Sequence, residues 1–136
     1  RVARVKTIRH ALQQAGLSAD EIDYVNLHGT STQLNDLNET QAIKQAFGEA
    51  AYTTPLSSTK SYSGHLIAAA GSFESIICLQ ALQRQIMPAT CNLKNADPQC
   101  DLDYISEGHR PKALRNTLNL SFGFGGANAA LVIGLD

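Results

Sequence analysis

Residues 22–30 read IDYVNLHGT, and this stretch decides how the chain folds. Its first part, Ile22–Leu27, is a compact apolar run of strand length, which predicts a β-strand. His28 and Gly29 follow directly, so the strand is expected to end in a small-residue loop that carries an imidazole. Since ligands bind outside the carboxyl ends of strands in open α/β sheets, this loop is a candidate functional site.

Helical patterns lie on both sides of this strand. Apolar residues recur at helical spacing over Val2–Ala15, and Gly16 is a favourable residue just past the end of a helix. After the His28 loop, Asn35 or Asp36 is expected to be the N-cap of a second helix, with Glu39 in capping-box spacing from Asp36. Helices alternating with strands predict an α/β fold with a mixed sheet.

The rest of the chain continues this alternation. Residues 66–82 are helical in spacing and apolar nearly all round, with Glu74 the sole charge, which predicts a buried central helix. Further strands are expected over Tyr52–Ser58, Asp101–Ile105, Thr117–Ser121 and Ala127–Leu135. The last two are separated by a Gly-rich turn and are predicted to pair antiparallel.

Composition limits the class of protein. The chain has 136 residues, 43% of them hydrophobic, which fits one globular domain over residues 1–136. Eleven basic against twelve acidic residues give a formal charge of -1, which argues against nucleic acid or an anionic membrane as the main partner. The longest apolar stretch is too polar to span a membrane. The first residue is not Met, so the chain is expected to be part of something longer.

Three cysteines, Cys78, Cys91 and Cys100, form no Cys-x-x-Cys pair. Neither a disulfide framework nor a zinc site is therefore predicted. Reduced thiols favour the cytoplasm, with a plastid or a mitochondrion as the alternatives.

Two more small-residue loops join the first as candidates. Residues 58–65 read STKSYSGH and end in His65, and residues 121–128 read SFGFGGAN around Phe124. Two neutral imidazoles that converge could donate hydrogen bonds to one thioester or enolate oxygen, which is oxyanion stabilisation. The alternative is that each histidine packs against a helix end.

The other candidate residues each allow two interpretations. Lys60 could pair with Glu74 and fix the loop of His65, or the two could form a structural salt bridge without catalytic consequence. Thr30 and Thr32 could bind an amide-rich ligand or cap the next helix. Phe124 could be a lid, or the core anchor of a tight turn.

Other catalytic templates fit less well. The phosphate-binding and dinucleotide-binding glycine patterns are absent. A Ser-His-Asp site could use Ser31, Ser61 or Ser63, but none lies in a Gly-x-Ser-x-Gly motif. A metal site of both histidines with Asp36 or Glu39 would lack the helical spacing of metal ligands.

Taken together, VNLHGTST (25–32), STKSYSGH (58–65) and SFGFGGAN (121–128) resemble the elongating β-ketoacyl-acyl-carrier-protein synthases of the thiolase superfamily. The similarity covers nearly the whole chain but corresponds to the carboxyl-terminal half of such an enzyme. Asn92-Leu93 and residues 100–104 (CDLDY) also resemble the bacterial and plastid type, closer to the fatty-acid enzymes than to modular polyketide synthases.

The resemblance implies an activity. The family condenses an enzyme-bound acyl group with malonyl-carrier protein through a Cys-His-His triad, releases carbon dioxide and uses no metal or organic cofactor. The expected partners are acyl-carrier protein, the acyl and malonyl thioesters, the missing amino-terminal half and, when complete, a second copy in a homodimer. No nucleic acid or membrane is expected.

The resemblance also implies residue roles. His28 and His65 match the histidines that polarise the malonyl thioester and stabilise the enolate. Lys60 matches the lysine that orders the site, and Glu74 falls where its acidic partner is expected. Three further residues match the pantetheine-binding threonines and the gating phenylalanine whose N–H helps form the acyl oxyanion hole: Thr30, Thr32 and Phe124.

The chain also departs from the family pattern. The nucleophilic cysteine belongs to the amino-terminal half, and none of the three cysteines here matches it, so this chain alone should be inactive. Gln33 and Asn35 replace the Pro and Gly of many relatives.

The resemblance further implies an incomplete thiolase-like half with sheet order 3-2-1-4-5, whose first strand would precede Arg1. Residues 24–27 and 117–121 would then flank an empty lane. Because unpaired buried edges are costly, the chain is expected to fold well only with its amino-terminal portion. The rival functions are a type II polyketide ketosynthase, its non-catalytic chain-length partner, or a mere packing module.

Overall fold

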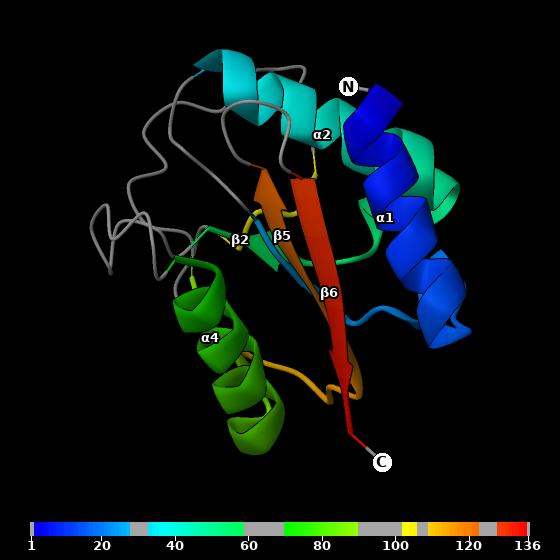
Figure 1. Cartoon of the computed structure of the whole chain (residues 1–136). Coiled ribbons are helices and arrows are strands. Elements are labelled where there is room, and N and C mark those ends of the chain that lie inside the picture. Colours follow the sequence, from blue (N-terminus) through cyan, green and yellow to red (C-terminus); the bar gives the residue numbers. More distant parts are fainter. Residues whose placement is uncertain are drawn as a thin grey trace.

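The structure is a computed structural model that describes residues 2–27, 33–58, 70–89, 102–105, 109–122 and 128–135. Figure 1 draws these residues in colour and the others in grey. The core of the molecule is a mixed sheet in the order β2-β1-β5-β6. Its strands are β1 (Tyr24–Asn26), β2 (Leu56–Ser57), β5 (Asn116–Phe122) and β6 (Asn128–Gly134).

Three strands of this sheet run parallel, and the last runs antiparallel. β1 pairs in parallel with β2 on one side and with β5 on the other. β5 and β6 pair antiparallel over seven residues each, from Asn116 opposite Gly134 to Phe122 opposite Asn128. The predicted mixed sheet and its antiparallel carboxyl-terminal pair are therefore confirmed.

The predicted empty lane between residues 24–27 and 117–121 is wrong. Tyr24, Val25 and Asn26 lie directly opposite Thr117, Leu118 and Asn119 in a parallel ladder. Direct pairing gives the backbone groups of both buried strands hydrogen-bond partners, so no intervening strand is needed. The sheet therefore has no gap at this position that would hinder independent folding, and whether the chain folds alone stays a prediction.

In the part of the chain that the structure describes, three α-helices cover the two faces of the sheet. α1 (Val2–Ala15) and α2 (Gln33–Phe47) pack together over one face, and α4 (Ala70–Arg84) packs on the other (Figure 1). This three-layer arrangement follows from the sequence, because each helix has an apolar side and each strand alternates its side chains between the two faces.

The first helix ends where its sequence predicts. Gly16 adopts a φ of +70°, a conformation that glycine takes without steric cost. The N–H of Gly16 donates to the carbonyl of Gln13, and that of Leu17 donates to Leu12, at 3.1 and 3.0 Å. This pair of bonds is a Schellman motif, which satisfies the last carbonyl groups of α1.

The second helix begins earlier than its sequence predicts. α2 starts at Gln33, so Asn35 and Asp36 lie inside its first turns and neither is the N-cap. Acidic residues are favourable throughout the first turn of a helix as well as at its N-cap, so this sequence pattern does not fix the residue at which the helix begins. The helix does end at Phe47, before Gly48 at a φ of +61°.

Two strand predictions need correction. Within 52–58 the strand is confined to Leu56–Ser57, because the 3₁₀ helix η2 (Gly48–Tyr52) takes up Tyr52. Residues 102–105 form no strand: Ile105 has a φ of +46°, which interrupts an extended chain, although the N–H of Leu56 still donates to the carbonyl of Asp103 at 2.9 Å. A short antiparallel pair was not anticipated, β3 (Ile86–Met87) with β4 (Arg110–Pro111).

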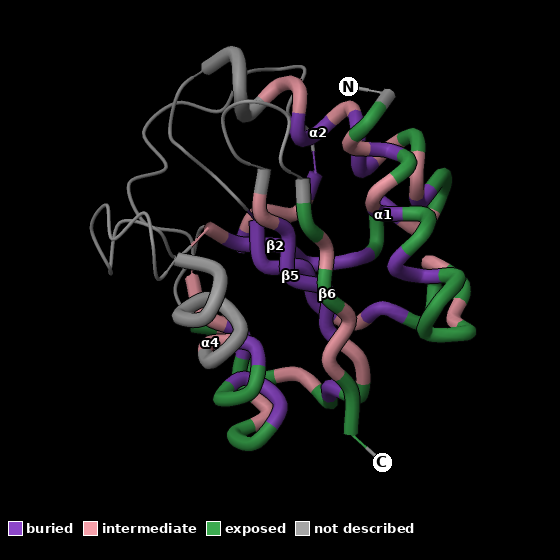
Figure 2. The backbone as a smooth tube through the Cα atoms, viewed as in Figure 1, coloured by how far each residue is buried: buried purple, intermediate pink, exposed green. Residues whose placement is uncertain are grey.

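The sheet separates two apolar cores. Val25, Leu118 and Leu120 pack with α1 and α2 on one side. Tyr24 packs with Cys78, Leu82 and other residues near α4 on the other side. In Figure 2, the buried strand β5 lies between α4 on one side and α1 and α2 on the other. The alternation of side chains along each strand produces this division.

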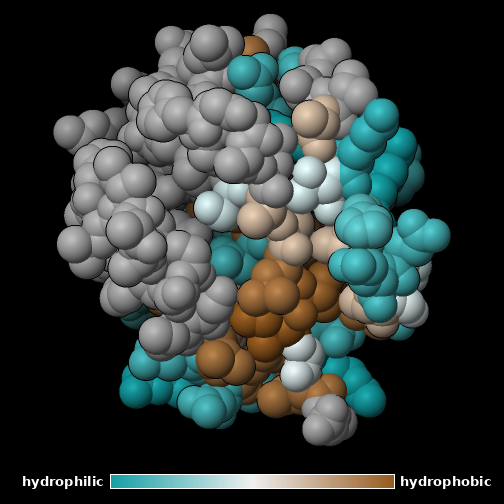
Figure 3. All heavy atoms as spheres, in the orientation of Figure 1, coloured by the Kyte–Doolittle hydropathy of each residue, from teal (hydrophilic) through white to brown (hydrophobic). Residues whose placement is uncertain are grey.

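The described part of α4 is buried on one side only. Cys78 and Leu82 face the sheet, whereas Leu79 is 45% exposed. Leu131 of β6 and Leu135, which follows β6, are also exposed, and Figure 3 shows an apolar patch on the face of the molecule drawn there. Residues 77–84 therefore do not show the all-round burial expected of a central helix. No helix within the described ranges is both long and apolar enough to cross a membrane.

An ion pair next to β4 makes a testable contribution to stability. Arg110 donates from Nη1 and Nη2 to the two carboxylate oxygens of Asp103, at 2.6 and 3.1 Å. This interaction lowers the pKa of Asp103 below its ordinary value. A carboxylate with a lowered folded-state pKa stabilises the fold above its unfolded pKa, and that contribution disappears as the pH falls through the folded pKa.

We therefore expect Asp103→Asn to lower the free energy of unfolding at neutral pH by no more than about 1 kcal/mol, since the pair is partly exposed. The difference from the unchanged protein should shrink as the pH falls below the ordinary pKa of an aspartate, about 3.9, and should vanish once the pH is below the lowered folded-state pKa. Urea unfolding at several pH values tests this, with the exposed Glu49→Gln as control. A difference independent of pH would show that charge is not its cause.

Candidate functional site

Three strands end at the same edge of the sheet. Because β1, β2 and β5 are parallel neighbours, their carboxyl ends point to the same edge of the sheet, where Figure 1 shows the arrowhead of β5. The chain continues from these ends into residues 28–32, 59–69 and 123–127. These are the segments in which the sequence places its candidate residues.

The predicted site residues themselves lie outside the described residues. This holds for His28, Thr30, Thr32, Lys60, His65 and Phe124. Glu74 is on α4, but its side chain is also outside the description. What the structure establishes about the predicted site is therefore its topology: the strands that precede the three segments end at one edge of the sheet.

Beneath this edge lies a row of buried polar side chains that sequence reasoning missed. Asn26 of β1 is directly opposite Ser57 of β2 and Asn119 of β5. Asn26 and Ser57 are 0% exposed and Asn119 is 4% exposed. Since their neighbours Val25, Leu56 and Leu118 pack toward α1 and α2, alternation puts all three polar side chains on the α4 face.

Hydrogen bonds join part of this row. Asn26 Nδ2 donates to the hydroxyl of Tyr24 at 3.0 Å, and the Tyr24 hydroxyl lies 2.6 Å from Ser57 Oγ. Tyr24 is itself 0% exposed. A signal was present in the sequence, because Asn26 and Asn119 are amide residues inside otherwise apolar strand runs, where burial requires a partner.

Lys112, a lysine with a lowered pKa, lies at the opposite end of β1. Lys112 Nζ donates to the carbonyl of Asp23 at 2.7 Å, just before β1 begins. Desolvation lowers the pKa of Lys112, while Asp23 and Asp103 oppose that effect. Asp23 Oδ2 also accepts from the N–H groups of Arg115 and Asn116, at 2.8 and 3.0 Å. These contacts fasten the amino ends of β1 and β5.

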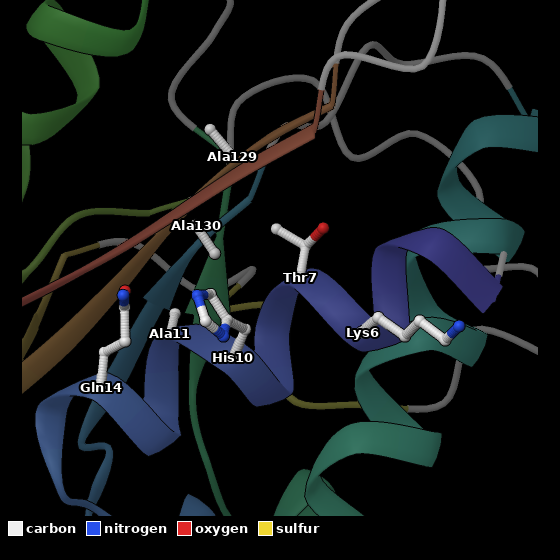
Figure 4. Close-up of a pocket in the computed structure, with 7 residues that line it drawn as sticks. All are labelled: Lys6, Thr7, His10, Ala11, Gln14, Ala129 and Ala130. Carbon is white, nitrogen blue, oxygen red and sulfur yellow. The ribbon is translucent and has the colours of Figure 1, made fainter.

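A shallow groove lies between α1 and β6. Figure 4 shows His10 and Thr7 lying toward Ala130 of β6, while Lys6 points away. The groove is open and its α1 side chains are largely exposed, so it lacks the convergent buried polar groups of a typical ligand site. Among the described residues, no cluster of His, Cys, Asp and Glu could hold a metal ion.

Comparison with known proteins identifies the family. Residues 1–94 match the model of the β-ketoacyl synthase C-terminal domain. The chain is 47% identical over 128 residues to a polyketide β-ketoacyl synthase of Streptomyces halstedii, covering 94% of this chain and 30% of that protein. It is 45% identical over 126 residues to 3-oxoacyl-[acyl-carrier-protein] synthase 2 of a Synechocystis strain, covering 93% and 30%.

A solved structure supports the same assignment. The chain superposes with a TM-score of 0.92 and 37% identity on a structure described as a type II polyketide acyl-carrier protein in complex with its ketosynthase. The match covers 98% of this chain and 33% of that one. The chain thus spans about a third of the length of the proteins it matches, and those proteins divide between fatty-acid and polyketide enzymes. The chain belongs to the β-ketoacyl synthase family of acyltransferases, in which it corresponds to the carboxyl-terminal domain.

Proposed function

We propose that this chain is the carboxyl-terminal part of a 3-oxoacyl-[acyl-carrier-protein] synthase that elongates fatty acids by decarboxylative Claisen condensation. The observation that carries the proposal is the common edge at which β1, β2 and β5 end, because the segments with His28, Lys60, His65 and Phe124 leave from it. Residues 1–136 would form one such domain.

In this proposal, the two histidines act on one oxygen. His28 and His65, neutral and each with one N–H, donate to the thioester carbonyl of malonyl-carrier protein. The bond to the terminal carboxylate then breaks, carbon dioxide leaves, and its electron pair forms an enolate whose oxygen the histidines stabilise. The enolate carbon attacks the acyl thioester, a carbon–carbon bond forms, and the cysteine thiolate departs.

The remaining candidate residues serve binding and order. Lys60, paired with Glu74, would hold the segment that carries His65. Thr30 and Thr32 would hydrogen-bond the amides of the pantetheine arm of acyl-carrier protein. Phe124 would gate the acyl site, and its N–H would bind the oxygen of the acyl group. No metal or organic cofactor takes part in this scheme.

In this proposal, the nucleophile comes from another part of the enzyme. Cys78 is buried in the α4 core, and Cys91 and Cys100 lie outside the described residues. We therefore propose that the complete enzyme, as a homodimer, supplies an upstream cysteine, and that the present chain alone does not form an acyl-enzyme.

Mapping of the acylated residue tests the proposal. When the complete enzyme is incubated with labelled acyl-carrier protein and digested, mass spectrometry should find the acyl group on an upstream cysteine. Label on Cys78, Cys91 or Cys100 would contradict the proposal. An inert residue such as Gln at the upstream nucleophile position, with no acylation, would instead identify a chain-length partner.

The second candidate function is a type II polyketide ketosynthase. The 47% identity to the Streptomyces polyketide synthase supports it about as strongly as the 45% identity to the Synechocystis enzyme supports the fatty-acid assignment. Product analysis separates the two. With acyl- and malonyl-carrier protein, but without reductase, a fatty-acid enzyme should stop after one condensation at a 3-oxoacyl product. Several successive condensations without reduction would support the polyketide enzyme.

A further inference from the structure

The hydroxyl of Tyr24 lies at the centre of a hydrogen-bonded chain that joins two strands. It accepts a hydrogen bond from Asn26 Nδ2 at 3.0 Å and lies 2.6 Å from Ser57 Oγ, across the β1–β2 boundary. All three residues are 0% exposed. Asn26 is two residues before His28, and Ser57 is three residues before Lys60.

We propose that Tyr24 is a positioning residue: through Ser57 and Asn26, its hydroxyl fixes how β1 and β2 present the segments that carry His28 and Lys60. This inference rests on the proposed function, because it concerns the geometry of the same site. Tyr24 does not touch the substrate in this scheme and acts through the strands.

Energetics favour a role in orientation over a role in stability. A buried hydrogen bond contributes little net free energy relative to well-packed apolar groups of the same shape, because both partners are removed from water. Apolar residues at these three positions would fill the same space between the sheet and the α4 side. A directional chain instead fixes the side chains of both strands in one arrangement, as buried polar networks do.

Such an arrangement matters where side chains from different segments must donate hydrogen bonds to one substrate oxygen. A displacement of about 1 Å caused by a distant change can lower the rate of an enzyme about 100-fold. Asn119 extends the same polar row onto β5, three residues before that strand ends at Phe122, whereas Asn26 and Ser57 are the last residues of β1 and β2.

The variant Tyr24→Phe removes the hydroxyl and keeps the ring in the α4 core. In the complete enzyme, we expect kcat for decarboxylation of malonyl-carrier protein to fall about 10- to 100-fold, with KM changed less than about threefold. Acylation of the upstream cysteine should stay within about threefold of the unchanged enzyme, because that half-reaction does not use the two histidines.

Thr117→Val is the matched control. Thr117 is also 0% exposed, lies directly opposite Tyr24 in β5, and donates its hydroxyl to the carbonyl of Ile133 at 3.0 Å. The variant Thr117→Val therefore also removes a buried hydroxyl, but one that bonds to β6 and not across the β1–β2 boundary. We expect both variants to lower Tm to a similar extent, but only Tyr24→Phe to lose decarboxylation. Equal decarboxylation in the two variants would overturn the inference.

A second variant keeps the test valid if Tyr24→Phe does not fold. Ser57→Ala is nearly isosteric and removes the other end of the same contact; it should lower decarboxylation about tenfold. The double variant should be no slower than the slower single variant, since both act through one hydrogen bond. A loss in the double variant equal to the product of the two single losses, or unchanged decarboxylation in Ser57→Ala, would contradict a role for this hydrogen bond.

The variant His28→Ala separates the two possible failures. If it loses decarboxylation while the Tyr24 and Ser57 variants do not, the proposed function stands and the positioning role fails. If His28→Ala retains full decarboxylation, the proposed function itself fails.

Discussion

Decarboxylation of malonyl-carrier protein should slow about 10²- to 10³-fold in each of the variants His28→Ala and His65→Ala of the complete enzyme. Each variant removes one hydrogen-bond donor aimed at the oxygen on which negative charge develops. In a water-excluded site, such a donor stabilises the transition state far more than the ground state. Release of carbon dioxide under single-turnover conditions measures the effect.

The acylation step serves as the internal comparison for these variants. We expect transfer of the acyl group to the upstream cysteine to fall less than about tenfold in both, because the acyl oxyanion is held by other groups. His10→Ala is the matched control, since His10 is an exposed histidine on α1. A variant pair that retains decarboxylation but loses acylation would reverse the proposed division of labour.

The double variant shows whether the two imidazoles share one task. If both donate to the same oxygen, the loss in the double variant should be smaller than the product of the single losses, because removal of either donor already misplaces the enolate. A product of two independent losses would instead indicate that the histidines serve different steps.

Much of the fold could be predicted from local patterns. The helix Val2–Ala15 and its end at Gly16 follow from a regular apolar stripe and a glycine that can adopt positive φ. The β5–β6 pair follows from two apolar runs around glycines. These elements were predictable because the forces that fix them act between residues close in sequence.

The arrangement of the sheet was not predictable in this way. Which strand pairs with β1 depends on contacts between residues about 90 positions apart, such as Tyr24 with Thr117, and no local pattern contains them. The sheet order taken from the family resemblance placed a gap there, and the ladder between β1 and β5 corrects it. The predicted short strand at residues 101–105 was wrong for a related reason: the backbone adopts a positive φ at Ile105, which the alternation of residues cannot reveal.

The candidate site likewise has one part that sequence motifs indicate and one part that depends on how the strands pair. Family motifs indicated His28, His65 and Lys60 from sequence, and the common edge of β1, β2 and β5 is consistent with their convergence. Asn26 and Asn119 are noticeable in sequence as amides within apolar runs, but the row was missed because no local pattern aligns them with Ser57. Its meaning arises from the register that aligns three strands.

The direct pairing of β1 with β5 predicts a large stability effect at Leu118. This residue is 0% exposed, lies opposite Val25 on one side and Val132 on the other, and packs in the core beneath α1 and α2. Leu118→Ala should lower the free energy of unfolding by about 2–5 kcal/mol, because it removes buried methyl groups and leaves a cavity that rigid neighbours cannot fill.

Leu131→Ala is the control for this prediction, since it makes the same chemical change on the neighbouring strand β6. Leu131 is 50% exposed, so the expected loss is below about 1 kcal/mol. Urea unfolding followed by circular dichroism measures both, and equal m-values would show that the two variants expose the same surface on unfolding. Were β1 and β5 separated by an unfilled lane, Leu118 would border solvent and the two substitutions would cost nearly the same. A clear difference between them would therefore support the β2-β1-β5-β6 order in solution, and with it the common edge on which the proposed site depends.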